Sequence, residues 1–149
     1  MTAPRAGASP GPRPDRTSLV AVASPGADIV GYASFGPERT VASVASVASV
    51  GSGTPPGALS PAGLAGETGE LYALYVAPAH WSTGVGRALT DAALDGLRAA
   101  GYRRVVLWTL TDNARARRFY DTAGFTPDGA TNVLAALGRV EELRYARDL

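Results

Sequence analysis

The chain has 149 residues, the usual length of one domain, and a formal net charge of +1 at pH 7. It holds no cysteine and a single histidine, His80, which excludes disulfides, a cysteine nucleophile and a multi-histidine metal site within one chain. The near-neutral charge argues against nucleic acid or an anionic membrane as a partner. There is no apolar run long enough for a transmembrane helix and no apolar core of a secretory signal, so we expect a cytoplasmic protein.

The first forty residues predict a hairpin behind a polar tail. Residues 1–17 hold four prolines and few apolar side chains, so we expect a disordered tail. The stretches SLVAVA (18–23) and IVGYASFG (29–36) are typical of strands, and SPGAD (24–28) between them is typical of a turn. Together they predict a β-hairpin.

A low-complexity segment follows the hairpin. VASVASVASV (41–50) repeats a tripeptide whose period matches neither strand nor helix and is far shorter than a solenoid unit. The residues after it are rich in Gly, Pro and Ser, as in a linker. We therefore predict a single domain over 18–149 that contains one long loop at 40–68.

The next segment predicts a strand, a helix and a second strand. ELYALYV (70–76) has aromatic and aliphatic residues on both faces, which favours a central, buried strand. A helix is predicted from Val85 to Ala100, with Gly101 as its stop, because apolar residues recur on one side: Val85, Leu89, Ala93 and Leu97. YRRVVLWTL (102–110) predicts another strand. This order requires a right-handed crossover and a parallel pair.

The last third predicts one more helix and one more strand. The helix spans roughly 113–123, with Thr111 or Asp112 as its N-cap and Gly124 as its stop. VEELRYARDL (140–149) predicts a final edge strand.

Two glycines stand where the buried strand gives way to the first helix. The first turn of a helix has unpaired N–H groups and the positive end of the helix dipole. Without a Cβ at Gly84 and Gly86, the oxygens of an anion can approach this backbone closely, and Arg87 adds a positive charge. The segment therefore favours a phosphorylated ligand. The alternative is that both glycines only permit a tight turn and close helix packing.

Two sequence signatures separate these alternatives. LYVAPAHWSTGVGRALTDAAL closely resembles the acyl-CoA-binding core of the GNAT N-acetyltransferases, which carries Q/R-x-x-G-x-G/A at this point. NARARRFYDTAGF (113–125) resembles the second signature of that family, with matches at Asn113, Ala116, Tyr120, Gly124 and Phe125. The resemblance covers about 18–39, 67–127 and, weakly, the C-terminal strand.

The resemblance implies an α/β fold with a seven-stranded, mixed, mostly antiparallel sheet. Its central parallel pair splays around acetyl-CoA, the cosubstrate, and helices flank the sheet. By the same resemblance the pyrophosphate is held by the loop of Thr83, Gly84, Val85, Gly86 and Arg87. The pantetheine arm pairs with the strand end at Leu74, Tyr75 and Val76, and Asn113 contacts this arm from the opposite side.

Acetyl transfer needs a neutral amine, a polarised carbonyl and a protonated leaving thiolate. A backbone N–H near Tyr75 or Val76 is a candidate to hold the oxyanion. Tyr120 matches the family tyrosine that protonates the sulfur, and its alternative role is a core aromatic. Glu70 could take the amine proton, directly or through water, or be a solvated strand end.

Some positions depart from the family pattern. Trp81 occupies the Q/R position, and Thr83 stands where a basic residue is common, which predicts mildly weaker phosphate binding. His80 is interpreted as a surface residue. The arginines of the second helix either form its wet face or include one that reaches the 3′-phosphate of CoA: Arg115, Arg117 and Arg118.

The hypothesis is thus an N-acetyltransferase acting on a primary amine of a small molecule, a protein N-terminus or a side chain. The family's usual first strand and two helices are not evident before residue 18, so we expect a partly open acceptor pocket and an exposed sheet edge that a homodimer would cover. One alternative is a CoA-binding or regulatory module without turnover. Another is a nucleotide-binding or interaction domain.

Overall fold

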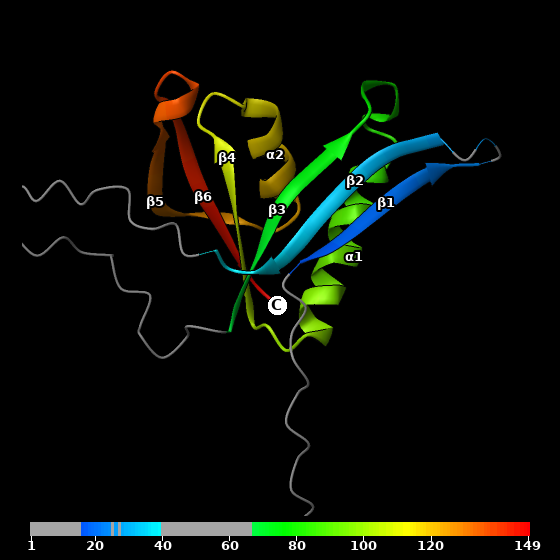
Figure 1. Cartoon of the computed structure of the whole chain (residues 1–149), viewed down its shortest axis with the longest axis horizontal. Helices are drawn as coiled ribbons and strands as arrows, with labels where there is room; N and C mark the ends of the chain where they lie inside the picture. Colours follow the sequence, from blue (N-terminus) through cyan, green and yellow to red (C-terminus); the bar gives the residue numbers. More distant parts are fainter. Residues whose placement is uncertain (1–15, 25, 27, 40–66) are drawn as a thin grey trace, which may run out of the picture.

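The computed structural model describes residues 16–24, 26, 28–39 and 67–149. These residues form a six-stranded mixed sheet with two α-helices, in the strand order β1-β2-β3-β4-β6-β5 (Figure 1). The α/β class and the mostly antiparallel sheet are confirmed. The elements are β1 Thr17–Ala23, β2 Asp28–Pro37, β3 Thr68–Val76, η1 Pro78–His80, α1 Val85–Ala99, β4 Arg104–Leu110, α2 Ala114–Thr122, β5 Thr126–Leu134, η2 Ala135–Leu137 and β6 Val140–Asp148.

The centre of the sheet is a short parallel pair. β3 and β4 are paired only from Thr68↔Arg104 to Leu71↔Leu107. After Leu71 the two strands diverge, and the sheet opens into a V with β1–β3 in one arm and β4–β6 in the other (Figure 1). The crossover from β3 to β4 runs through α1, as a parallel pair requires.

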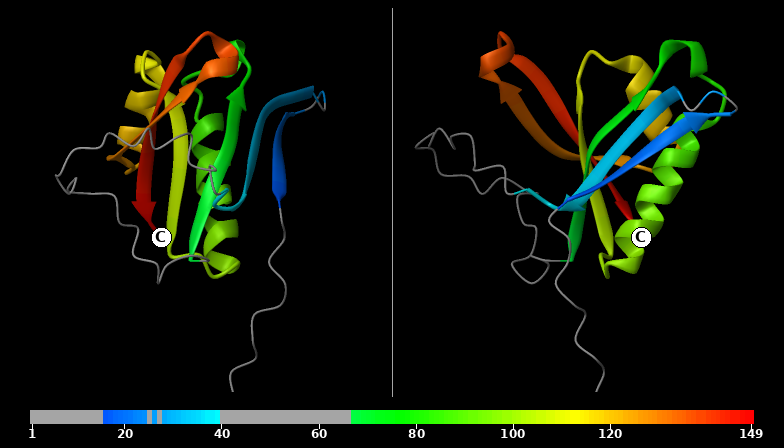
Figure 2. Two further views of the ribbon diagram at one scale, coloured as in Figure 1. Left: turned by 60° about the vertical axis from the view of Figure 1, so that its left-hand side comes forward. Right: turned by 45° about the vertical axis from the view of Figure 1, so that its right-hand side comes forward.

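The core lies between α1 and one face of the sheet. Leu89, Ala93 and Leu97 are buried along one side of α1, as their spacing predicts, and each buried leucine contributes about 1.5–3 kcal/mol. The helix lies close to the sheet at Gly96, where a Cβ would stand 2.7 Å from the ring of Phe35. Figure 2 shows α1 running along the back of β1–β3.

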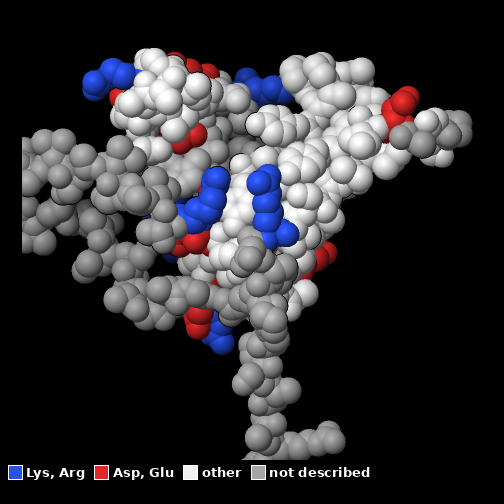
Figure 3. All heavy atoms as spheres, in the orientation of Figure 1, with Lys and Arg blue, Asp and Glu red and all other residues white. Residues whose placement is uncertain are grey.

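The opposite face of the sheet carries no helix within the described residues, and it is the face turned toward the viewer in Figure 1. Basic and acidic side chains are interspersed on this face (Figure 3).

Several predicted boundaries hold. β1 and β2 pair antiparallel from Thr17↔Phe35 to Ala23↔Asp28, so the hairpin is confirmed. α1 ends one residue before its predicted end, and Gly101 and Gly124, at φ +85° and +82°, follow the two helices as predicted. β3 is central, but its second half is only partly buried because it faces the open V.

Two predictions about elements are wrong, and one strand was not predicted. The N-cap of α2 is Asn113, whose side chain accepts from the N–H of Ala116 at 3.0 Å, and not Thr111 or Asp112. The strand predicted at 140–149 is internal, because β5 covers its outer edge. β5 escaped prediction because Pro127 and Gly129 interrupt it, and its pairing with β6 is irregular between Pro127 and Thr131.

The ends of the predicted tail and loop also need correction. Thr17 already belongs to β1, and Arg16 donates to the Ser34 hydroxyl at 2.9 Å, so the tail does not reach residue 17. Thr68 belongs to β3, so the loop does not reach residue 68. The rest of the predicted tail and loop, with the tripeptide repeat at 41–50, lies outside the described residues. None of the helices in the described ranges could cross a membrane.

Candidate functional site

The loop between η1 and α1 presents a run of free backbone donors. Within the described part of the chain, no hydrogen bond uses the N–H groups of residues 82–87, and the first N–H with a backbone partner is that of Ala88, which donates to the Gly84 carbonyl at 2.9 Å. Gly84 has φ +91°, and nothing lies within 4 Å of a Cβ built on it. The backbone here requires glycine, and the space beside it is open. This arrangement suits an anion.

Trp81 holds this loop in place because its indole contacts residues from both arms of the V. Its indole Nε1 donates to the Val76 carbonyl at the end of β3, at 2.7 Å. The guanidinium of Arg115, from α2, lies 3.4 Å from the centre of the Trp81 ring. Such a cation–π contact contributes about 0.5–1 kcal/mol at an exposed site. Trp81, at the position where the family carries Gln or Arg, is thus not charged itself but holds the guanidinium of Arg115 beside the loop.

Other loop side chains have local partners. The Thr83 hydroxyl donates to the His80 carbonyl at 2.6 Å, which secures the turn. Arg87 pairs with Asp91 one turn along α1 at 3.1 Å, and both are more than half exposed. An exposed ion pair of this kind contributes only about 0.3–0.5 kcal/mol to stability. An anionic ligand could therefore replace Asp91 as the partner of Arg87. His80 is half-buried in η1, so its interpretation as a surface residue holds only in part.

The second half of β3 has one unpaired edge. Leu74, Tyr75 and Val76 pair with β2, but the ladder with β4 has already ended at Leu71. Their opposite edge faces the V, as the predicted pairing with a pantetheine arm requires. Tyr75 is 70% exposed, which also contradicts a fully buried strand.

Asn113 lies where α2 follows β4. Its Oδ1 serves as the N-cap of α2, so only the amide nitrogen remains for a ligand. Val85 and Gly86 form the first turn of α1, and a Cβ on Gly86 would lie 3.4 Å from the Phe119 ring. Gly86 therefore serves helix packing as well as loop access.

Tyr120 combines both roles considered for it. Its ring packs edge-on against Phe119 and Phe125, with centroids 5.4 and 5.9 Å away, and joins the edge of the core. Its hydroxyl takes part in no hydrogen bond within the described residues. Burial, followed by the influence of Tyr75, raises the pKa of Tyr120 to about 12. The phenol therefore keeps its proton throughout the neutral range.

Glu70 is not a solvated strand end. Its side chain is 1% exposed, and both carboxylate oxygens accept from Arg39, one from the backbone N–H at 2.8 Å and the other from the guanidinium. Arg39 lies over the ring of Tyr72, with 4.5 Å to the ring centre. Because the Arg39 side chain is 62% exposed, it covers Glu70 from the solvent side.

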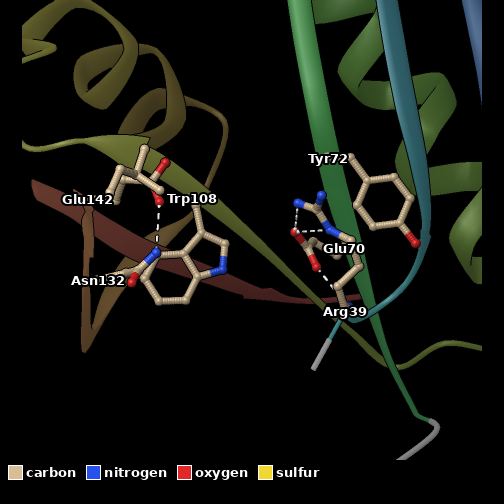
Figure 4. Close-up of a pocket in the computed structure, with 7 residues that line it drawn as sticks. Arg39, Glu70, Tyr72, Trp108, Asn132 and Glu142 are labelled. Carbon is tan, nitrogen blue, oxygen red and sulfur yellow. Dashed lines mark hydrogen bonds and ion pairs between the residues drawn. The ribbon is translucent and has the colours of Figure 1, made fainter. Parts of the chain in front are cut away.

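Glu70 forms part of a pocket of about 360 Å³ on the open face of the sheet. Figure 4 shows two walls that face each other, with Glu70 and Tyr72 on β3 and Arg39 just after β2 in one wall, and Trp108, Asn132 and Glu142 in the other arm. Leu134 completes the lining. Apart from Glu70, the sequence pattern did not indicate these residues, because they come from four strands and the segment after β2 and share no local spacing.

The described residues contain no group of three His, Cys, Asp or Glu side chains arranged to hold a metal ion.

The splayed mixed sheet and the glycine loop at the start of α1 agree with a family-level match. Residues 8–125 match the model of the acetyltransferase (GNAT) family, and the chain belongs to this family.

Individual relatives agree with this assignment. A mycothiol acetyltransferase from Beutenbergia cavernae is 57% identical over 60 residues, which are 40% of this chain and 20% of that protein. The match thus spans only a fifth of the relative. A GNAT-family structure from Desulfovibrio desulfuricans is 26% identical, with a TM-score of 0.61, over 90% of this chain and 69% of that one. A structure from Salmonella typhimurium with its cofactor acetyl-CoA shares the fold at 24% identity and a TM-score of 0.61, over 89% of this chain and 64% of that one.

The tyrosine environments predict an alkaline titration in which three tyrosines depart from the ordinary pKa: burial raises the pKa of Tyr120 and of Tyr72, and hydrogen bonds lower the pKa of Tyr32. Tyr120 should ionise near pH 12, whereas hydrogen bonds with Ser18, then Ser34 and Arg16, lower the pKa of Tyr32 to about 8. Ultraviolet absorbance of tyrosinate should show that Tyr120→Phe removes only the highest step and Tyr32→Phe the lowest. The pKa of Tyr120 is higher in the folded than in the unfolded protein, so the fold favours the neutral phenol. The contribution of Tyr120 to the free energy of unfolding is therefore complete below pH 10 and is lost as the pH rises from 10 to 12. A step near pH 10 lost in Tyr120→Phe, with circular dichroism still native, would contradict this assignment.

Proposed function

We propose that this protein transfers an acetyl group from acetyl-CoA to an amine. The observation that carries the proposal is the run of free N–H groups at 82–87, next to the unpaired edge of β3. Family membership supports the reaction type. The acceptor, a primary amine of a small molecule or of a protein, is part of the proposal, as are a cytoplasmic location and a homodimer.

The cofactor would lie in the open V. The loop amides from Thr83 to Arg87 would hold the pyrophosphate, with added charge from Arg87 and from Arg115 on its Trp81 platform. The pantetheine arm would pair with Leu74–Val76, and the side-chain amide nitrogen of Asn113 would contact it from the other arm. Arg115 in this role offsets the lack of a basic residue at Trp81 and Thr83.

The chemistry would proceed by direct attack of the amine on the thioester carbonyl. The C–N bond forms as the carbonyl oxygen gains charge, and an N–H of Tyr75 or Val76 is the candidate donor to it. The C–S bond then breaks, and Tyr120 donates to the departing sulfur. A phenol with a pKa of about 12 is protonated at every working pH, which a donor requires.

Glu70 would accept the proton that the amine loses. The Arg39 guanidinium covers the carboxylate, so an amine or a bridging water reaches it only where Arg39 shifts aside, and the exposure of Arg39 permits this movement. The competing role is structural: the ion pair would tie the end of β2 to β3.

The phosphate-binding loop is tested by Gly84→Ala against Gly138→Ala. Both glycines have positive φ and open space around a built Cβ, so each substitution should cost about 1–2 kcal/mol of stability. Only Gly84→Ala should weaken CoA binding, by about tenfold or more, because the strained loop loses aligned N–H donors. Calorimetry with CoA measures the affinity.

In the same assay Arg115→Ala should weaken CoA binding most at low salt, since its contribution is electrostatic. Equal CoA affinity in the Gly84 and Gly138 variants would refute the loop assignment, and an unaltered Arg115→Ala affinity would remove that arginine from the site.

The role of Tyr120 is tested by Tyr120→Phe. Loss of the proton donor should lower kcat by about 10²–10⁴-fold, while CoA affinity stays close to that of the wild type. The assay incubates acetyl-CoA with an amine panel and measures free thiol. Tyr145→Phe is the matched control, because Tyr145 is a buried neighbouring tyrosine whose hydroxyl accepts from Arg117 at 3.3 Å. Unchanged turnover in Tyr120→Phe would exclude it as the acid, and CoA binding without turnover in the wild type would favour the regulatory alternative.

The role of Glu70 is tested by comparing Glu70→Gln with Arg39→Gln. As a base, Glu70 should be needed for turnover and for the acidic limb of the pH–rate profile, whereas Arg39→Gln should stay active because the base remains. As a structural partner, Glu70 should matter for thermal stability to the same extent as Arg39. Equal losses of stability with an unaltered pH profile would exclude the base.

A further inference from the structure

The pocket on the open face has an unbalanced charge. Its lining contains one arginine and two glutamates. Arg39 and Glu70 are bonded to each other through three hydrogen bonds, so their charges cancel. The charge that remains in the lining is the carboxylate of Glu142.

Glu142 forms no ion pair within the described residues, and Arg39, the one arginine in the lining, acts on it only at longer range because its guanidinium is bonded to Glu70. The one hydrogen bond of Glu142 in this part of the chain comes from the Asn132 amide nitrogen at 3.3 Å. The nearest arginine on the same strand, Arg144, is already held by Asp128 at 2.8 Å and by Glu38 at 3.1 Å. Glu142 is also half-buried, and a partly desolvated carboxylate without a directly bonded cation is costly. A cation in the pocket would relieve this cost.

The walls of the pocket suit a cation on an apolar stem. The half-buried indole of Trp108 stands beside Glu142, and Leu134 and the ring of Tyr72 add apolar surface (Figure 4). Aromatic faces attract guanidinium groups, as Arg39 over Tyr72 at 4.5 Å and Arg144 over Trp108 at 5.8 Å show. A methylene chain can pack against the remaining surface of both rings.

We propose that the acceptor carries a second positively charged nitrogen, which Glu142 and Asn132 bind across the pocket from Glu70. The substrate class is then a diamine, or a compound whose reactive amine is joined by an apolar spacer to an ammonium or guanidinium group. This inference rests on the proposed acetyl transfer, because it identifies the pocket as the acceptor site. Glu142 is a specificity-determining residue in this scheme, and it takes no part in bond formation.

The test compares three amines of equal chain length whose far ends differ in charge: 1,4-diaminobutane, 4-amino-1-butanol and 4-aminobutanoate. The wild type should show a KM about tenfold or more lower for the diamine than for the amino alcohol, since a charge-assisted contact is worth at least that factor. Glu142→Gln should remove this preference, because glutamine can still accept from Asn132 but carries no charge. Glu141→Gln, an exposed neighbour on the same strand, should keep the preference.

Binding without turnover separates this inference from the proposed function. Calorimetry of 1,4-diaminobutane with the full chain should show an affinity that Glu142→Gln weakens about tenfold, even where no amine is acetylated; that outcome would retain the cation site and refute acetyl transfer. The inference is overturned if acetylation shows no preference for the diamine, if 4-aminobutanoate is preferred, or if Glu142→Gln and Glu141→Gln behave alike.

Discussion

The early end of the parallel ladder between β3 and β4 is the constraint on which the site depends. Four residue pairs hold the two arms of the sheet together, and beyond Leu71 and Leu107 no backbone bonds join them. A strand edge without a partner leaves donors and acceptors that must be satisfied by something else. In this fold the free edge of β3 points into the opening, so a ligand with an extended polar arm can complete the ladder.

The opening is accessible from two sides, and the two sides differ in chemistry. On the helix side, the loop before α1 offers backbone N–H groups and nearby arginines, which suit phosphates. On the open side, a pocket lined by aromatic rings and carboxylates suits a cation. An acyl donor rich in phosphate and an amine acceptor would therefore enter from opposite faces and meet between β3 and β4. Tyr120 and Glu70 belong to the two arms, so each reactant has a candidate proton-transfer group near it.

Ion pairing determines which charges are available to ligands. Two sets of charges near the pocket are paired within the protein: Arg39 with Glu70, and Arg144 with Asp128 and Glu38. Glu142 is the charged residue of the pocket lining that forms no ion pair within the described residues. On the loop side, Arg115 is held by an aromatic ring rather than by a carboxylate, so its charge is not neutralised there. The same protein thus presents a cation toward one face and an anion toward the other without a large net charge.

The local sequence alone determined the hairpin, the two helices, the glycine loop and the positions of Tyr120 and Asn113, because periodicity, caps and positive-φ glycines act over a few neighbouring residues. It did not indicate β5, whose strand depends on pairing with β6 despite Pro127 and Gly129. It also missed the Arg39–Glu70 pair, the Trp81–Arg115 stack and the pocket around Glu142. The ion pair and the stack join residues 31 or more positions apart, and the pocket is lined by residues from separate strands. Only the tertiary structure could decide these contacts, since charge compensation and enclosure depend on which distant side chains the folded sheet brings together.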